Sequence, residues 1–384
     1  MKATCRVKVS RKPFLRLHNY LLGCASELCA PILRVVTEKL VPGQKSPPAT
    51  WKRGLIISHT RIGDVLFRTP SLEQLKKRLP DCEWHYLTST DSADVLRGNP
   101  FLTSVLRLCE PSGTLRLLPA AAEELRAMNF DVALCTNPQT YWQDHKVALA
   151  AKIPNRIGFV HRGLSGLVTS AVTCNYPSPW AGYFREMVAQ VTGTSPDWPL
   201  IPRMYASEED ERLALAQWQK MELPIDRPVL ACFMTTRESS HVWPKDYYSE
   251  TLKWIHQKSG TQVVLAGSKQ DTPVLGQFAA QRGVPCRVMA GELGLRGLFC
   301  FLKKCAAVLA PDSGPRHIAN AAGTPVVFIR NLVGSKIETG RYCSNEIDLS
   351  PDAEFVPVNK QESLLRRVAP TLVAQTILQL LGRR

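Results

Sequence analysis

One short loop places a carboxylate where an acid–base reaction would need one. The loop runs from Ser58 to Asp64 and reads Ser-His-Thr-Arg-Ile-Gly-Asp, between an apolar run and a helical pattern. At the mouth of a cleft, the Asp64 carboxylate could take the proton from an attacking hydroxyl group. Arg61 and Gly63 are the neighbouring candidates for contact with that substrate, and the glycine would permit close approach to the backbone.

A structural role for the same loop stays open. Asp64 falls in the first turn of the expected helix, where a carboxylate complements the helix dipole and caps free N–H groups. Taken alone, the spacing favours this capping role over catalysis. The loop has no Gly-x-Gly-x-x-Gly pattern, so a dinucleotide site of the dehydrogenase kind is not supported.

A second loop, Asp312-Ser-Gly-Pro-Arg-His317, combines helix-start and anion-binding features. Ser313 fits an N-cap. With Gly314 beside it, the helix start would present free N–H groups and the positive end of the helix dipole to an anion. Arg316 and His317 add side-chain donors that could reach a diphosphate. A well-capped structural turn explains the same residues equally simply.

The third candidate loop is Thr235-Thr236-Arg237, which directly follows an apolar run. Two hydroxyl groups and a guanidinium suit phosphate oxygens. His241 comes next, and its imidazole could reach a phosphate or stay solvated. An ordinary polar surface loop is the alternative for the whole segment.

The chain around these loops predicts strands and helices in alternation, which is typical of βαβ units around a parallel sheet. Each candidate loop follows an expected strand. The expected strands form two series, 54–58, 83–87, 104–108, 131–135 and 156–160, then 229–233, 262–266, 287–289, 306–310 and 325–329. Ligands bind open α/β sheets at the carboxyl ends of their strands. We therefore expect an α/β protein with two Rossmann-like, doubly wound domains facing a cleft.

Composition points to a globular protein with an anionic partner. The 384 residues include 48 Lys and Arg against 33 Asp and Glu, a net charge of +15, which favours an anionic partner or a generally basic surface. No apolar run approaches the length of a membrane span. The 12 cysteines include no Cys-x-x-Cys pair, so no zinc or redox motif is supported and a reducing cytosol fits best. The basic residues are dispersed without a recognition motif, so we expect no nucleic-acid partner.

Residues 13–40 predict a basic amphipathic helical segment, which Pro31 would kink or split. Such a segment can lie on an anionic membrane or pack on the body of the protein. Both readings stay open, so we expect a cytoplasmic protein for which peripheral contact with the cytoplasmic face of the inner membrane is one alternative.

The three loops, in this order and spacing, resemble the bacterial lipopolysaccharide heptosyltransferase family, glycosyltransferase family 9. The resemblance covers roughly residues 54–335 and rests on an ordered set of motifs. These are Gly63-Asp64 with Pro70, Thr235 through Pro244, Asp312 through His317, and Asn155-Arg-Ile-Gly-Phe159.

The resemblance implies a GT-B fold and an inverting transfer without a metal or other cofactor. The donor would be an ADP-sugar, ADP-heptose, and the acceptor a hydroxyl of an anionic glycolipid of the lipopolysaccharide-core type. Asp64 would be the catalytic base. The donor site would comprise Thr235, Thr236, Arg237, His241, Asp312, Ser313, Gly314 and His317.

With these roles, the expected organisation has four parts. They are a basic amphipathic extension and linker (1–50), an acceptor-side domain (51–205), a nucleotide-sugar-binding domain (206–360), and a C-terminal helix (361–384) that could pack back on the N-terminal domain.

Two departures from the family pattern leave alternatives open. Where the family has a lysine before Trp-Pro, this chain has His241, and an acidic residue expected after the turn at 267 is matched only by Asp271 with a shifted loop. A neutral imidazole would stabilise a leaving diphosphate less than an ammonium group. The alternatives are a GT-B-like transferase or epimerase that uses another nucleotide sugar, and a catalytically weakened nucleotide-sugar-binding protein.

Overall fold

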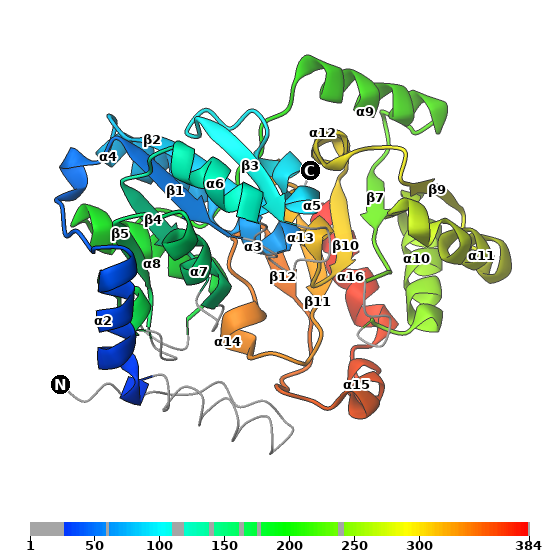
Figure 1. Cartoon of the computed structure of the whole chain (residues 1–384). Coiled ribbons are helices and arrows are strands. Elements are labelled where there is room, and N and C mark those ends of the chain that lie inside the picture. The colour runs from blue at the N-terminus through cyan, green and yellow to red at the C-terminus, as the bar shows by residue number, and fades with distance from the viewer. Residues whose placement is uncertain are drawn as a thin grey trace. The chain divides into compact units, whose positions relative to one another are not determined.

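The chain folds into two compact units, Met1–Leu200 and Ile201–Arg384 (Figure 1). The computed structural model describes residues 27–58, 61–109, 119–137, 142–160, 165–174, 178–236 and 242–382. Each unit is described by itself below.

Unit 1 is built on a parallel six-stranded sheet with the order β3-β2-β1-β4-β5-β6. The two central strands, β1 and β4, are buried almost throughout, as a sheet covered on both faces requires. The strands are β1 (Arg53–Ile57), β2 (Glu83–Ser89), β3 (Ser104–Cys109), β4 (Val132–Cys135), β5 (Asn155–Phe159) and β6 (Ser170–Val172). The five strands expected from the sequence are confirmed, and β6 was not expected.

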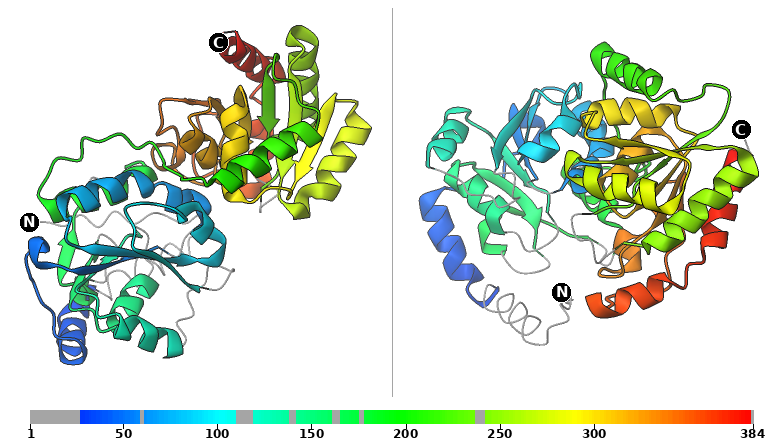
Figure 2. Two further views of the ribbon diagram at one scale, coloured as in Figure 1. Left: turned by 90° about the horizontal axis from the view of Figure 1, so that it is seen from above. Right: turned by 90° about the vertical axis from the view of Figure 1, so that its right-hand side faces the viewer.

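Helices cover both faces of this sheet (Figure 2). They are α2 (Ala30–Leu40), α3 (Ile62–Leu66), α4 (Thr69–Arg78), α5 (Thr90–Ala93), α6 (Pro119–Ala127), α7 (Trp142–Ala150) and α8 (Trp180–Thr192), with short 3₁₀ turns η1 (Pro48–Thr50), η2 (Asp94–Leu96) and η3 (Ser165–Leu167). Pro31 lies in the first turn of α2, where a proline is tolerated. Residues 27–28 are also helical and Cys29 is a turn, so the helical segment is interrupted just before Pro31, in line with the expected kink or split.

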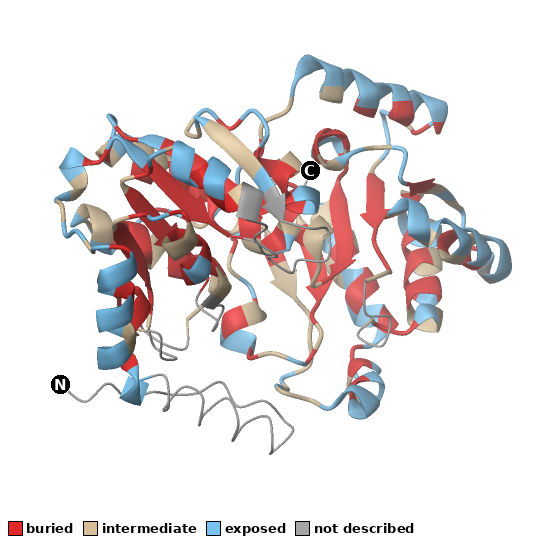
Figure 3. Ribbon diagram, in the orientation of Figure 1, coloured by how far each residue is buried: buried red, intermediate tan, exposed pale blue. Residues whose placement is uncertain are grey.

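Unit 2 repeats the same plan with the sheet order β12-β11-β10-β7-β8-β9, again parallel throughout. Its strands are β7 (Val229–Cys232), β8 (Gln262–Gly267), β9 (Cys286–Ala290), β10 (Ala307–Pro311), β11 (Val326–Ile329) and β12 (Glu346–Asp348). The buried strands lie beneath helices whose outer faces are exposed (Figure 3). The five expected strands are confirmed here too, and β12 was not expected.

The helices of unit 2 include a C-terminal pair where the sequence suggested one bent helix. They are α9 (Glu208–Lys220), α10 (Lys245–Ser259), α11 (Thr272–Arg282), α12 (Leu295–Lys304), α13 (Gly314–Ala322), α14 (Lys336–Thr339), α15 (Val358–Leu365) and α16 (Pro370–Leu381), with the turn η5 (Lys269–Asp271). Pro370 opens α16, because a proline is favoured in the first turn and disruptive inside a helix.

The last helix differs from the expectation that it packs back on the N-terminal domain. It packs against α10, and Val373, Ala374 and Ile377 are fully buried in the hydrophobic core of unit 2. The Thr251 hydroxyl of α10 donates to the carbonyl of Pro370 over 3.2 Å. The apolar stripe that marked this helix in the sequence is therefore satisfied inside unit 2.

The two sheets share one strand order when each is numbered from its own first strand. In unit 1 the first strand, β1, lies between β2 and β4, and in unit 2 the first strand, β7, lies between β8 and β10. The direction of winding reverses between β1 and β4, and between β7 and β10. Such a switch point opens a crevice at the carboxyl ends of its two strands, which is where doubly wound sheets bind ligands.

No helix among the described residues is long and apolar enough to cross a membrane.

Candidate functional site

The Asp64 loop lies at the switch point of unit 1. Ser58 follows β1 directly, and its N–H donates to the carbonyl of Leu87 on β2 over 2.9 Å. Asp64 is the third residue of α3 and is partly exposed, while Gly63 is buried and Arg61 is the exposed N-cap residue. Helix start and catalytic loop are thus the same segment, so capping geometry does not exclude a role in acid–base chemistry.

Arg68 ties this short helix to the neighbouring strand. Its Nε donates to Thr136 Oγ1 over 2.7 Å, and its Nη1 donates to the backbone carbonyl of Asp64. Thr136 follows β4, and its hydroxyl donates in turn to the carbonyl of Ile57 at the end of β1 over 2.9 Å. The arginine is only 6% exposed. These bonds fix the backbone at Asp64 to both strands of the switch point, which makes Arg68 a positioning residue that the sequence did not reveal.

Other ionisable groups gather beneath the loop. Burial raises the pKa of Tyr86, on β2, to about 12, and the charges that act on it are those of Arg68, Asp64 and Asp144. Asp144 lies on α7 and is almost fully buried. Asp144 was assigned no role from the sequence.

The second and third candidate loops meet at the switch point of unit 2. Thr235 and Thr236 follow β7 and are partly buried, and Asp312 and Ser313 follow β10. The N–H of Phe233 donates to the carbonyl of Leu309 over 2.8 Å, so the two strand ends are held side by side. Two loops that are about 75 residues apart in the sequence therefore follow adjacent parallel strands at the carboxyl edge of the sheet, which is where doubly wound sheets bind ligands.

The start of α13 is open in the way an anion site needs. Ser313 has the extended backbone of an N-cap residue, with φ −152° and ψ 174°, but its hydroxyl makes no capping bond to the helix. It donates instead to the carbonyl of Pro311 at a long 3.5 Å. Gly314 begins the helix. Pro315 has no N–H and the Arg316 N–H donates to the Ser313 carbonyl over 3.1 Å, so the Gly314 N–H and the helix dipole are what this helix start offers to a phosphate.

Arg316 was expected to offer donors to a diphosphate, and the structure corrects this expectation. Its side chain is 1% exposed and lies between protein acceptors. Nε and Nη2 donate to the two carboxylate oxygens of Glu346 over 2.6 and 3.1 Å, and Nη1 donates to Asp312 over 2.8 Å. Nη1 and Nη2 also donate to the carbonyls of Thr339 and Gly340. All five donors of the guanidinium are used, so none remains for a ligand.

His317 is held neutral beside this ion pair. Burial, then the charge of Arg316, lowers the pKa of His317 to about 3. Its Nδ1 lies 2.8 Å from the Tyr342 hydroxyl, which also accepts a hydrogen bond from Asn320 over 2.9 Å. A neutral imidazole carries one N–H and one acceptor nitrogen, so His317 can both donate and accept a hydrogen bond.

Asp312 is the carboxylate that connects this network to the crevice. It is 15% exposed, and its Oδ1 lies 2.8 Å from Arg316 Nη1 and 3.8 Å from His317 Nε2. Burial raises its pKa, and the adjacent guanidinium partly offsets that rise. The ion pair between Asp312 and Arg316 thus joins the loop after β10 to α13.

Arg237 and His241 lie outside the described residues. Whether His241 replaces the family lysine is therefore argued from the sequence alone. Trp243, just beyond them, is buried and donates through its indole N–H to the carbonyl of Val368 over 3.1 Å. Asp271 accepts from the backbone N–H and hydroxyl of Ser268, which makes it the capping partner of a 3₁₀ turn.

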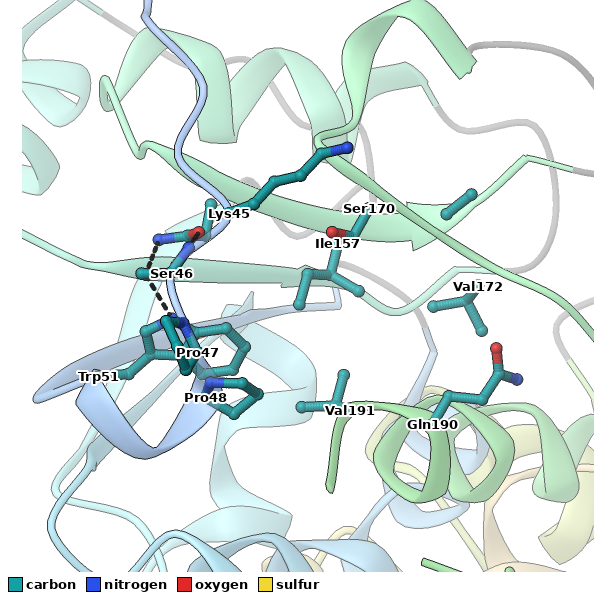
Figure 4. A pocket seen from close by; sticks show the side chains of 12 residues that line it. Lys45, Ser46, Pro47, Pro48, Trp51, Ile157, Ser170, Val172, Gln190 and Val191 are labelled. Carbon is teal, nitrogen blue, oxygen red and sulfur yellow. Dashed lines mark hydrogen bonds between the residues drawn. The ribbon is translucent and has the colours of Figure 1, made fainter. Parts of the chain in front are cut away.

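A cavity of about 290 Å³ in unit 1 lies away from these loops (Figure 4). Its walls include Asn155 and Ser170, the first residues of β5 and β6, and Trp51, which precedes β1. It therefore opens at the amino ends of the strands, opposite to the switch-point crevice. The Trp51 indole and the Asn155 amide both donate to the Ser46 hydroxyl over 3.0 Å, so these polar groups of the cavity wall are hydrogen-bonded to one another.

Residues 119–330 match the model of glycosyltransferase family 9 (heptosyltransferase). Lipopolysaccharide heptosyltransferase 2 of Salmonella typhimurium is 24% identical over 290 residues, which cover 72% of this chain and 81% of that protein.

Two solved structures show the same fold. A glycosyltransferase family 9 protein from Veillonella parvula superposes with a TM-score of 0.78 at 18% identity, over 89% of this chain and 100% of the other. ADP-heptose lipopolysaccharide heptosyltransferase II of Escherichia coli gives a TM-score of 0.68 at 21% identity, over 86% and 99%. The expected GT-B fold of two Rossmann-like domains is confirmed. Since one family model matches more than half of its length, the chain belongs to glycosyltransferase family 9 and is a glycosyltransferase.

Proposed function

We propose that this protein moves a heptose from ADP-heptose to a hydroxyl group of a lipopolysaccharide-core glycan, with inversion at the anomeric carbon and without a metal ion. Family membership supports the reaction class. The relatives named for lipopolysaccharide and for ADP-heptose support the acceptor and donor classes. The net charge of +15 suits an acceptor that carries carboxylates and phosphates.

The observation that carries this proposal is the position of the candidate loops. The acceptor-side loop and the two donor-side loops, found independently in the sequence, fall at the switch points of two sheets with one strand order. A carboxylate stands at one switch point, and hydroxyl groups with an uncapped helix start stand at the other. This is the division of groups that a transfer from a diphosphate leaving group needs.

In the proposed reaction, Asp64 accepts the proton of the acceptor hydroxyl as its oxygen attacks the anomeric carbon. The new carbon–oxygen bond forms while the bond from that carbon to the diphosphate oxygen breaks. The electron pair of the breaking bond leaves with ADP. Thr235, Thr236 and the Gly314 N–H meet the charge that develops on the diphosphate, and neutral His317 adds one donor in the tautomer that carries its proton on Nε2.

Arg68 acts in this scheme through Asp64. A base must lie within hydrogen-bonding reach of the proton that it removes. The bonds from Arg68 to Thr136 and to the backbone of Asp64 set where α3 begins relative to β1 and β4. Arg61 and Gly63, in the same loop, are proposed to contact the acceptor.

Because lipopolysaccharide precursors are lipids, we place the reaction at the cytoplasmic face of the inner membrane, with the enzyme bound there peripherally. Nucleic acid has no part in the proposed function.

A transfer assay with the full chain tests the proposal. Purified protein is incubated with ADP-heptose and an acyl-free core acceptor in excess EDTA, and the product is followed by mass spectrometry and its anomeric configuration by NMR. We expect one heptose added, inverted configuration, and a rate unchanged by EDTA. UDP-glucose and UDP-N-acetylglucosamine serve as control donors, and we expect neither transfer nor thermal protection from them.

Each contrary result points to one part of the proposal. Transfer from a UDP-sugar alone would make the protein a GT-B enzyme with another donor. Thermal protection by ADP-heptose without turnover on any acceptor would make it a binding protein. Retained configuration would overturn the direct displacement, and loss of rate in EDTA would overturn metal independence.

A further inference from the structure

Helix α2 carries an apolar face that unit 1 leaves uncovered. Of the thirteen large apolar side chains that are exposed among the described residues, five lie between positions 28 and 40. At 3.6 residues per turn they fall within an arc of about 140° on one side of the helix. They are Leu28 (82% exposed), Ile32 (69%), Val35 (56%), Val36 (46%) and Leu40 (68%).

The opposite face of α2 is fastened to unit 1. Ala30 and Thr37 are buried, and the Thr37 hydroxyl donates to the carbonyl of Gly166 in η3 over 2.9 Å. Arg34 donates to the carbonyl of Ser165 over 3.3 Å. A Cβ atom at Gly166 would lie 2.7 Å from the Ala30 carbonyl oxygen, so the helix and η3 are in close contact there. The helix therefore cannot turn its apolar arc inward without breaking these contacts.

The sequence that leads into this helix is strongly basic. Residues 1–45 contain nine Lys and Arg against two Asp and Glu, which is +7 of the chain's net +15 in about an eighth of its length. Residues 1–26 contribute six of the basic residues and no acidic one. Lys39 lies within the apolar arc of α2, where its aliphatic stem can follow the apolar surface while the ammonium group reaches outward.

We propose that this apolar arc of α2, which carries Lys39, is a docking surface for an anionic phospholipid bilayer. A wide apolar arc within a basic segment of the chain is typical of helices that lie in a membrane interface. A symmetric dimer through the same face would set two segments of charge +7 against each other, which disfavours a second copy as the occupant. The inference rests on the proposed function for its purpose, because it brings the active site to an acceptor held in a bilayer.

Vesicle co-sedimentation of the full chain tests the surface directly. The probes are vesicles of phosphatidylcholine alone and vesicles with about 30 mol% phosphatidylglycerol, which supplies the anionic surface. The variant is Ile32→Asp with Val35→Asp, two exposed positions away from the contacts with η3. The matched control is Leu213→Asp with Leu215→Asp, two side chains on α9 that are each 43% exposed.

We expect wild type and the α9 control to bind the anionic vesicles, weakly at high salt, and not the neutral ones. The α2 variant is expected to lose at least about tenfold in partition coefficient, because a carboxylate at each position opposes both burial and the surface charge. Its transfer rate to an acyl-free acceptor stays at the wild-type value, which separates membrane docking from catalysis.

Equal vesicle binding by wild type and the α2 variant would overturn the proposal, as would no binding by wild type. If wild type is a dimer that the α2 variant dissociates in sedimentation velocity, and vesicles do not bind, the face belongs to a second copy. Loss of transfer in wild type with intact vesicle binding would count against the proposed function and leave the docking surface standing.

Discussion

The two switch points occupy equivalent places in their sheets but are built differently. At unit 1, the key carboxylate belongs to a five-residue helix, and the contacts found around it hold its backbone through Arg68. At unit 2, Asp312 is held through its carboxylate, which bonds to an arginine whose donors are all engaged. One site fixes a backbone and leaves the carboxylate partly exposed, whereas the other fixes the side chains themselves.

The difference matches the demands of the two halves of the proposed reaction. A base must meet acceptor hydroxyls and change its protonation state, so its carboxylate has to be reachable. A diphosphate site has to present donors that are already oriented when charge develops, because reorientation during the reaction would weaken their effect. A buried, saturated network below α13 keeps the helix start in place without competing for the ligand.

The largest effect is expected from breaking the unit 2 network at its centre. Arg316→Met leaves Glu346, whose side chain is fully buried, and Asp312 without their cation. We expect a loss of about 3–5 kcal/mol in the free energy of unfolding of unit 2, measured by urea denaturation.

Two further variants sharpen this result. Arg212→Met, which removes an exposed ion pair with Glu209 on α9, is expected to leave the free energy of unfolding nearly unchanged, because water and salt screen exposed charges. Adding Glu346→Gln to Arg316→Met is expected to recover part of the loss, because it removes one unpaired buried charge. A loss for Arg316→Met no larger than that for Arg212→Met would show that the network does not hold unit 2 together.

The next largest effect concerns the hydrogen bonds of Arg68 in unit 1. Arg68→Met removes the bonds that fix Asp64 and is expected to lower kcat by roughly 10- to 100-fold, as small displacements of catalytic groups do. The donor Kd stays within about twofold of wild type, because the donor loops lie in unit 2.

Arg78→Met on α4 is the matched control. Like Arg68→Met, it removes side-chain hydrogen bonds of an arginine in unit 1, although Arg78 is only half-buried. We expect kcat to be unchanged in that variant. An equal fall in kcat for both variants would reduce Arg68 to a general structural role.

The smallest effect concerns the pH dependence of stability. His317 has a pKa of about 3 in the folded protein and about 6.5 when unfolded, so between these values only the unfolded chain takes up its proton. The histidine therefore supports folding above pH 6.5, and the free energy of unfolding falls as the pH drops toward 3, by at most about 1.4 kcal/mol per pH unit.

His317→Gln removes this contribution. Urea denaturation between about pH 4 and 7 should then show a shallower decline of stability on acidification than in wild type. The same slope in both proteins would mean that His317 is not held neutral in the folded state.

The sequence predicted the sheets better than it predicted the contacts between loops. Long apolar runs marked the ten longer strands, whereas β6 and β12 have three residues each and lie at sheet edges, where no pattern accumulates. Helix α8 was missed because it lies in a proline-rich stretch without clear periodicity. The three candidate loops were located correctly at strand ends, since this needs only local pattern.

Side-chain contacts between residues that are far apart in the sequence could not be predicted from local pattern. Arg68 and Thr136 are 68 residues apart, and Arg316 and Glu346 are 30 apart. Both pairs depend on the strand order, which the sequence pattern does not give. Arg316 was consequently interpreted as a donor to a ligand, because its neighbours Gly314 and His317 fitted such a role. Its actual acceptors, in the segment from Thr339 to Glu346, could not be identified from the sequence.

The most direct test of the division between the two sites is to measure donor affinity and turnover together in Asp64→Asn and Thr235→Val. We expect Asp64→Asn to lower kcat by about 10²- to 10⁴-fold while the Kd for ADP-heptose, from isothermal titration calorimetry, stays within about twofold of wild type. Thr235→Val is expected to weaken donor binding by roughly tenfold. Wild-type turnover in a folded Asp64→Asn protein, or a loss of donor affinity equal to its loss of rate, would contradict the assignment of Asp64 as the acceptor-side base.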